Sequence, residues 1–176
     1  GAATVVNATD LDLAASTVNG DLVATATTGN LTDSGTVTVT GTSSFATSAA
    51  NADITVDQLA STGAVSLSTT GTSGAATVVN ATDLDLAAST VNGDLVATAT
   101  TGNLTDSGVV TVTGTSSFAT SAADADITID QLASTGAVSL ITTGTTGSAT
   151  VVNATDLDLA ASTVNGDLVA TATTGN

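Results

Sequence analysis

Apolar and polar residues alternate along short segments of the chain, with Thr, Ser or Asp at the polar positions. The clearest alternation occupies the segments 10–13 (DLDL), 36–40 (TVTVT), 53–57 (DITVD) and 64–68 (AVSLS). Because the pattern repeats every two residues, one face of each segment points inward and the other points toward solvent. This arrangement predicts half-buried β-strands. Thr alone fills 40 of the 176 positions, and this abundance of β-branched residues disfavours helices.

The strand pattern repeats at a fixed period: the stretch that opens at Gly1 returns at Gly74 and again at Gly147. Residues 1–73 and 74–146 differ at only five positions, namely Thr36→Val109, Asn51→Asp124, Val56→Ile129, Ser68→Ile141 and Ser73→Thr146. A fixed period is typical of repeat architectures, in which each unit buries its core against its neighbours. We therefore interpret 1–73 as repeat one, 74–146 as repeat two and 147–176 as a partial repeat three.

Glycines that precede strands divide each repeat into shorter units. They lie at Gly20, Gly41 and Gly63, and the next unit begins at Gly93, so the last unit is the longest. Units of this length predict an all-β fold, a parallel β-helix (β-solenoid) with about three coils per repeat. The longer last unit is expected to bulge at residues 69–75. The repeats then form one continuous solenoid, which we expect to be a segment of a longer array.

Aligning the coils predicts which apolar residues stack inside the solenoid. The three expected stacks are Val37 with Ile54 and Leu84, Val39 with Val56 and Leu86, and Ala24 with Phe45 and Leu67. Phe45 and Phe118 are the only aromatic residues, so they are the bulkiest expected core residues. The alternative architecture is a string of small β-sandwiches, one per repeat. A single Phe per repeat leaves such a sandwich little to bury.

The composition removes most catalytic chemistry. The chain has no Lys, Arg, His, Cys, Met, Pro, Trp, Tyr or Glu, and all 16 acidic residues are Asp. No imidazole, thiol or side-chain amine is therefore present to act as a base or nucleophile. Pairs such as Asp10/Asp12 and Asp53/Asp57 resemble the acid–base pairs of polysaccharide hydrolases, but they recur along the array without aromatic sugar platforms. We expect no enzymatic activity and no cofactor other than a calcium ion.

A net charge of −16 without any basic residue restricts the partners. The chain has nothing with which to neutralise phosphates, so nucleic-acid binding is not expected, and an anionic membrane surface repels it. No apolar run approaches the ~18 residues of a membrane-spanning helix, and no signal peptide is recognisable. The richness in Thr, Ser, Ala and Gly is typical of secreted bacterial surface proteins, so we expect an extracellular or cell-surface location.

Hard cations with oxygen ligands remain possible, whereas metals that need Cys or His ligands are excluded. The coil alignment places Asp53 beside Asp83, and Asp126 beside Asp156, on neighbouring coils. Two carboxylates ~5 Å apart repel each other unless they are protonated or bridged by a cation. This arrangement suggests a weak calcium site. An exposed acidic face that is screened by salt explains the same residues without a metal, and the loop motifs of EF-hands and calcium β-rolls are absent.

The glycine-led strand openings, the turns rich in Thr, Ser, Asn and Gly, and the missing Cys resemble secreted bacterial β-strand-repeat proteins of the filamentous-haemagglutinin and adhesin type. The resemblance covers all 176 residues and implies a right-handed β-helix on the cell surface that acts in adhesion, matrix or filament formation. The near-identical repeats and the absence of basic residues favour a fibre over a receptor-specific adhesin tip. We therefore expect a surface fibre, filament, sheath or adhesin stalk, with other copies of itself and surface glycans as partners.

Two other functions fit parts of the same pattern. The first is a calcium-dependent adhesin built from β-sandwich modules. The second is an ice-binding β-solenoid, for which the segment 36–40 supplies the best Thr-x-Thr array. The coil alignment places 53–55 and 83–85 beside it, and their Asp residues interrupt a flat threonine surface.

Several Asn-x-Thr triplets match the acceptor pattern for N-glycosylation, among them those at Asn7, Asn80 and Asn153. Such matches arise easily in a chain rich in Asn and Thr. Asn also serves in the turns of β-helices, where its side chain hydrogen-bonds to the backbone, and we expect this structural role.

Overall fold

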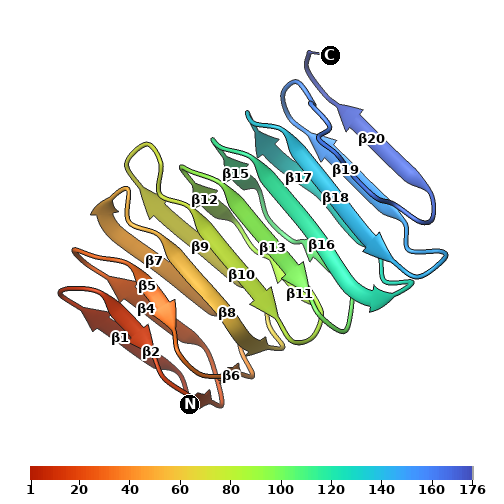
Figure 1. Ribbon diagram of the computed structural model, residues 1–176. Coiled ribbons are helices and arrows are strands. Elements are labelled where there is room, and N and C mark those ends of the chain that lie inside the picture. The colour runs from red at the N-terminus through yellow and green to blue at the C-terminus, as the bar shows by residue number, and fades with distance from the viewer. Residues whose placement is uncertain (176) are drawn as a thin grey trace.

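The computed structural model of the protein describes residues 1–175, and it is a parallel β-solenoid of about eight turns (Figure 1). Every strand pair among the described residues is parallel, for example β1 (Ala3–Asn7) with β4 (Leu22–Ala26). In this part of the chain no helix is long and apolar enough to cross a membrane. The predicted all-β solenoid is therefore confirmed.

The strands form two parallel sheets that enclose the core between them. The first sheet has 11 strands, which are β1, β4, β7 (Ser43–Ala50), β9 (Val65–Thr70), β11 (Leu84–Leu86), β12 (Ser89–Val91), β14 (Leu104–Asp106), β15 (Val110–Val112), β17 (Ile127–Ser134), β19 (Ala149–Asn153) and β20 (Leu168–Ala172). The second sheet has nine strands, which are β2 (Leu11–Leu13), β3 (Ser16–Val18), β5 (Leu31–Asp33), β6 (Val37–Val39), β8 (Ile54–Ser61), β10 (Ala76–Asn80), β13 (Leu95–Ala99), β16 (Ser116–Ala123) and β18 (Val138–Thr143).

One sequence repeat makes three and a half turns, not three. The chain crosses between the sheets in the order β1, β2–β3, β4, β5–β6, β7, β8 and β9, which is seven half-turns, and β10 then opens repeat two in the second sheet. A full turn carries the chain from Ala3 to its partner Leu22, or from Leu31 to its partner Ile54. Because the number of turns is not whole, equivalent residues of consecutive repeats lie on opposite faces of the solenoid.

This half-turn corrects the coil alignment at the end of each repeat. The long unit from Gly63 to Gly93 is not a bulged coil, because Val65 pairs with Leu86 in the first sheet while the strand after Gly93 belongs to the second. Residues 69–75 form an ordinary corner, in which β9 ends, Gly71 adopts a φ of 88° and β10 begins.

Two of the three expected stacks are wrong, because Val37 and Val39 pair in another register with β8 and because the half-turn places β11 in the first sheet. Val37 pairs with Leu59, while Ile54 pairs with Leu31 and Ala76. The second stack fails likewise, because Val39 pairs with Ser61 and Val56 with Val78. Leu84 and Leu86 pair in the first sheet, away from both groups.

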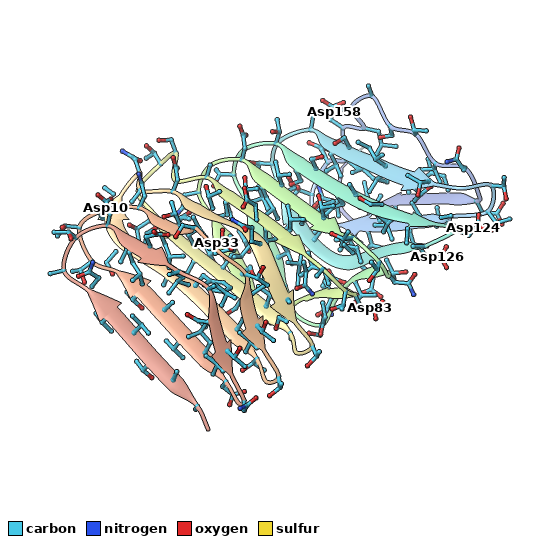
Figure 2. The ribbon with its side chains drawn as sticks, turned by 60° about the horizontal axis from the view of Figure 1, so that its bottom comes forward. Asp10, Asp33, Asp83, Asp124, Asp126 and Asp158 are labelled. Carbon is cyan, nitrogen blue, oxygen red and sulfur yellow. The ribbon has the colours of Figure 1, made fainter. Side chains whose placement is uncertain are left out.

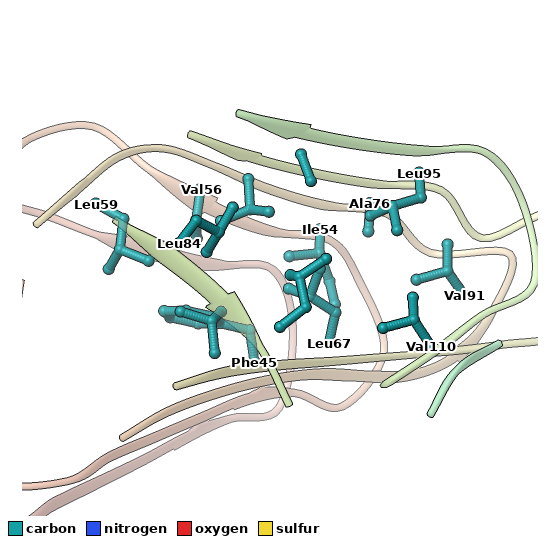
Figure 3. Packing of buried hydrophobic residues seen from close by; sticks show 14 of the residues in the cluster. Phe45, Ile54, Val56, Leu59, Leu67, Ala76, Leu84, Val91, Leu95 and Val110 are labelled. Carbon is teal, nitrogen blue, oxygen red and sulfur yellow. The ribbon is translucent and has the colours of Figure 1, made fainter. Parts of the chain in front are cut away.

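The third stack is confirmed, since Ala24 pairs with Phe45 and Phe45 pairs with Leu67 in the first sheet. Phe45 and Phe118 are fully buried, and Figure 3 shows Phe45 beside Leu67 and Ile54 in the interior. A small residue on one side of the ring and a leucine on the other keep this narrow core closely packed.

The repeat-to-repeat substitutions follow the two faces of the strands. Val56→Ile129 lies in the core, where both residues are fully buried. Thr36→Val109 and Ser68→Ile141 lie at exposed positions. Substitutions are tolerated most easily where no packing is disturbed, and this distribution agrees with the predicted inward and outward faces.

Glycine is required where successive turns approach each other at a corner. A Cβ atom on Gly63 would lie 2.3 Å from the carbonyl oxygen of Gly41, and one on Gly41 would lie 2.6 Å from the carbonyl carbon of Gly20. The glycines that precede the strands are thus contact points between the backbones of stacked turns.

Strand pairing crosses the boundary between repeats without interruption. β8 of repeat one pairs with β10 of repeat two, and β9 pairs with β11 and β12. Separate β-sandwich modules would have no such pairing, so the sandwich alternative is wrong.

Candidate functional site

Several aspartates lie at the corners of the solenoid, where they accept hydrogen bonds from the backbone of the next turn. One such ladder begins at Asp10, whose Oδ1 accepts from the N–H of Asn30 at 2.7 Å. Asn30 Oδ1 accepts from the N–H of Asp53 at 2.9 Å, and Asp53 Oδ1 accepts from the N–H of Ala75 at 2.8 Å. At a corner the backbone lies outside the strands, so its N–H groups have no partner in the strand ladder. The Asp and Asn side chains accept hydrogen bonds from these N–H groups.

Repeat two builds the equivalent ladder on the opposite edge. Asn103 donates to Asp83 Oδ1 at 2.7 Å, Asp126 donates to Asn103 Oδ1 at 2.8 Å, and Ser148 donates to Asp126 Oδ1 at 2.8 Å, in each case through the backbone N–H. Figure 2 shows Asp83 and Asp126 along one edge of the solenoid and Asp10 on the other.

The expected pairing of Asp53 with Asp83 is therefore wrong. Asp53 precedes β8 of the second sheet, whereas Asp83 precedes β11 of the first. The pairing of Asp126 with Asp156 fails in the same way, because Asp126 precedes β17 of the first sheet and the segment after Asp156 pairs with β18 of the second. Both errors arise from assuming that a repeat closes after a whole number of turns. Within residues 1–175, no group of three or more Asp residues is arranged to hold a metal ion.

Asn51 and Asp124 occupy a second kind of corner and have positive φ angles of 65° and 62°. Asp124 Oδ1 accepts from the backbone N–H groups of Thr145 and Thr146 at 2.7 and 2.8 Å. These hydrogen bonds stabilise the ionised carboxylate, so they lower the pKa of Asp124. Asn and Asp adopt left-handed backbone geometry more readily than other residues with a side chain, which accounts for the Asn51→Asp124 exchange.

Asn80 and its equivalent Asn153 are fully buried. Asn80 Oδ1 accepts from the N–H of Ser61 at 2.8 Å, and its Nδ2 donates to the carbonyl of Ser61 at 2.8 Å and to that of Asp83 at 2.6 Å. The side chain thus bridges two turns with its polar groups satisfied. This confirms a structural role for these two Asn residues and leaves their side chains inaccessible to a glycosylating enzyme in the folded protein.

A β-bulge in β8 creates the most distinctive local structure. The pairing of β8 with β10 skips a residue between Val56 and Leu59, so Asp57 and Gln58 are both exposed. Their backbone N–H groups donate to Oδ1 and Oδ2 of Asp33, each at 3.0 Å. Burial raises the pKa of Asp33, while these two hydrogen bonds act in the opposite direction and the charge of Asp57 adds to the rise. Asp33 therefore anchors the bulge.

Repeat two has the same arrangement in the first sheet. Asp106 accepts from the N–H groups of Asp130 and Gln131 at 3.0 and 2.9 Å, and burial likewise raises the pKa of Asp106.

A shallow surface cavity of about 200 Å³ lies beside the bulge, and we call it the bulge hollow. It is lined by Thr36, Asp57, Gln58, Leu59, Val79, Ala81 and Thr100. The hollow crosses four successive turns, because its lining comes from the strands β8 and β10 and from residues next to β6 and β13. The second repeat has an equivalent bulge hollow on the other face, with a volume of about 190 Å³. It is lined by Val109, Asp130, Gln131, Leu132, Val152, Ala154 and Thr173.

The threonine-rich outer face is interrupted. Thr38 of β6 has Thr17 of β3 on one side and Ala60 of β8 on the other. The coil alignment places residues 53–55 and 83–85 beside Thr38, and these are not its neighbours in the structure. A flat Thr-x-Thr array is broken both in the expected arrangement and in the observed one.

The sequence did not lead us to the bulge and its anchoring carboxylates, yet it carries a signal for them. Inward positions Ile54 and Val56 are two residues apart, but the next inward residue is Leu59, three positions later. This break in the period of two marks the extra residue of a bulge. The partner Asp33 belongs to the preceding turn, so its role depends on the register between turns.

Comparison with known proteins gives one match. The sequence model for a family described as Repeats of unknown function (DUF5649) matches residues 1–68 and again residues 73–141. No curated protein and no solved structure matches the chain. The two matches cover most of the chain and begin within a residue of the first two repeat starts, so this β-solenoid belongs to the DUF5649 family of repeats of unknown function.

Proposed function

We propose that the chain is a non-catalytic structural protein of the cell surface, whose repeats build a fibre, filament, sheath or adhesin stalk. The observation that carries the proposal is the uninterrupted strand pairing across the repeat boundary, from β8 to β10 and from β9 to β11. An array of this kind has no flexible joint between repeats, so its length grows in proportion to the number of repeats.

The composition and the resemblance to secreted β-strand-repeat proteins support an extracellular location. The chain has no Cys, so its stability does not depend on the redox conditions of its compartment. Stacking of the turns, instead of disulfide bonds, stabilises the fold. The corner ladders run in one direction along the chain, since each carboxylate accepts from the following turn. This polarity supports head-to-tail extension of the array, through further repeats or through further copies of the chain.

The experiment that tests the proposal measures length against repeat number. Arrays of two, four and eight repeats are joined at the repeat boundary and imaged by electron microscopy. We expect straight rods that lengthen by about 17 Å per repeat, which is three and a half strand spacings of about 4.8 Å. Bent or beaded particles, or a length that does not rise linearly, would contradict the proposal.

Extension by association of separate copies is tested on the same arrays. Sedimentation velocity over a hundredfold range of protein concentration distinguishes the two modes of extension. Head-to-tail addition predicts species that are multiples of the array mass and whose frictional ratio rises with mass. A single species at all concentrations would restrict extension to repeats within one chain.

A further inference from the structure

We propose that each bulge hollow is a docking site for a long basic side chain, lysine or arginine, of a partner protein. The proposal goes beyond the structural role above, and it stands or falls independently of that role. It rests on the shape of the hollow, on the chemistry of its lining and on the charge of the chain.

The lining matches the two parts of such a side chain. Val79 and Ala81, which are not buried in the core, offer an apolar floor against which an alkyl stem packs. The carboxylate of Asp57 and the amide of Gln58 stand at the rim, where they receive the cationic head. The floor and the rim are contiguous, because Val79 lies in β10 directly opposite the bulge of β8 that carries Asp57 and Gln58.

The rim is held in place before a partner arrives. The carboxylate of Asp33 accepts hydrogen bonds from the backbone N–H groups of Asp57 and Gln58. The exposed side chains of these two residues therefore project from a fixed backbone. A preorganised site loses little conformational freedom on binding. Asp33 also brings a second negative charge close to Asp57, and a bound cation relieves the repulsion between the two carboxylates.

Charge complementarity identifies the partner as a different molecule. The chain has no Lys or Arg, so a second copy offers no cationic side chain to either hollow. Sugars are usually gripped by aromatic platforms, and both aromatic residues of this chain, Phe45 and Phe118, are fully buried. A basic segment of another protein fits the hollow better than a glycan does.

The half-turn in each repeat places these sites on alternating faces. The hollow of repeat one opens on the second sheet and that of repeat two opens on the first, with Val109 in place of Thr36 as the one difference in the lining. Sites on the same face are seven turns apart, which is about 34 Å. An array therefore displays basic-segment sites along both faces, so that a partner with several such segments binds with avidity.

The test uses nuclear magnetic resonance on the 176-residue chain, with an N-acetylated, C-amidated lysine as the probe and the norleucine analogue as its neutral counterpart. We expect the lysine probe to shift the backbone signals of Gln58, Leu59, Gln131 and Leu132 at millimolar concentration. The double variant Asp57→Asn/Asp130→Asn should weaken this binding about tenfold, because the charged partner at the rim is lost.

Two further variants separate docking from general attraction to an acidic protein. Asp10→Asn/Asp83→Asn removes the same charge from the corner ladders and should change the affinity less than twofold. Ala81→Phe/Ala154→Phe fills both hollows without changing the charge and should abolish the shifts.

Three outcomes would overturn the proposal. One is equal binding of the norleucine probe, and another is equal loss of affinity in the corner variant and the rim variant. The third is a set of shifts at the same residues from a neutral methyl glycoside but none from lysine, which would assign the hollow to a glycan.

Discussion

At the scale of the residue, the chain uses two devices: full burial of a few large side chains and hydrogen bonding of turn backbones by Asp and Asn. Phe45 and Phe118 fill the core, and Asn80 ties one turn to another through three hydrogen bonds to backbone groups. The acidic residues act in the same way, because the corner carboxylates accept from the N–H groups of the next turn. The Asp and Asn residues at these positions are thus explained by the hydrogen-bonding needs of stacked turns.

Removal of the large core side chain should be costly. Phe45→Ala leaves a cavity between Ala24 and Leu67, which pair on either side of the ring. We expect a loss of about 3–5 kcal/mol in the free energy of unfolding. The measurement is urea unfolding followed by circular dichroism, with Val23→Ala on the exposed face as the control. An unchanged midpoint in Phe45→Ala would place the ring outside the core.

The anchoring carboxylates of the bulges predict a pH effect. Burial raises the pKa of Asp33 and Asp106 above the ordinary value of 3.8, so the folded state holds these protons more tightly than the unfolded state. Stability should therefore fall as the pH rises above about 3.8 through the folded pKa. We expect the melting temperature to decline over this range, and to decline less in the double variant Asp33→Asn/Asp106→Asn.

The control for this effect is Asp10→Asn/Asp83→Asn, which removes the same number of charges from the corners. General charge repulsion also weakens with acid, and the control variant accounts for that contribution. If both double variants show the same dependence of melting temperature on pH, the bulge carboxylates are not its source.

At the scale of the element, the alternation of apolar and polar residues was enough to predict the strands and their faces. Alternate side chains of a strand point to the same face, so the apolar residues of each pair point inward together. Examples are Leu11 with Leu13 and Val37 with Val39. The stacking of Ala24, Phe45 and Leu67 also followed from the spacing of the glycines.

Register between turns was harder to predict than the strands themselves. The long spacing from Gly63 to Gly93 fits one bulged coil or one and a half ordinary coils equally well from spacing alone. The expected calcium pairs depended on that choice, and they failed with it. Apolar residues occupy the inward positions of both sheets. The alternation of apolar and polar residues therefore does not indicate to which sheet a strand belongs.

The glycine contacts at the corners make a prediction about turn stacking. Gly63→Ala places a Cβ atom 2.3 Å from the carbonyl oxygen of Gly41, so the two backbones must move apart. We expect a loss of about 1–3 kcal/mol in unfolding free energy, measured by urea unfolding, whereas Ser66→Ala in the adjoining strand should have little effect. Equal stability of the two variants would show that the turns are not in such close contact.

At the scale of the whole molecule, the charge of −16 without a single cationic side chain sets the response to salt. Repulsion among carboxylates destabilises the compact state, and any salt screens it. We expect the melting temperature to rise with sodium chloride, and calcium and magnesium chloride at equal ionic strength to raise it equally. A rise of several degrees that is specific to calcium would contradict this prediction and would indicate a calcium site.

The half-turn in each repeat is the central claim about the whole molecule, because the alternation of equivalent sites between the two faces follows from it. Ser68 pairs with Thr90 on the outer face of the first sheet, whereas Thr98 lies in β13 of the second. A repeat of three coils would instead align the strands after Gly63 and Gly93, which places Ser68 beside Thr98.

The most direct measurement is disulfide formation between introduced cysteine pairs, which is unambiguous in a chain that has no Cys of its own. Neighbouring parallel strands are about 4.8 Å apart, within the Cα separation that a disulfide spans. Ser68→Cys/Thr90→Cys should form an intrachain disulfide under mild oxidation, while Ser68→Cys/Thr98→Cys should remain reduced. The reverse result, a disulfide in the Ser68→Cys/Thr98→Cys variant and none in Ser68→Cys/Thr90→Cys, would contradict the account.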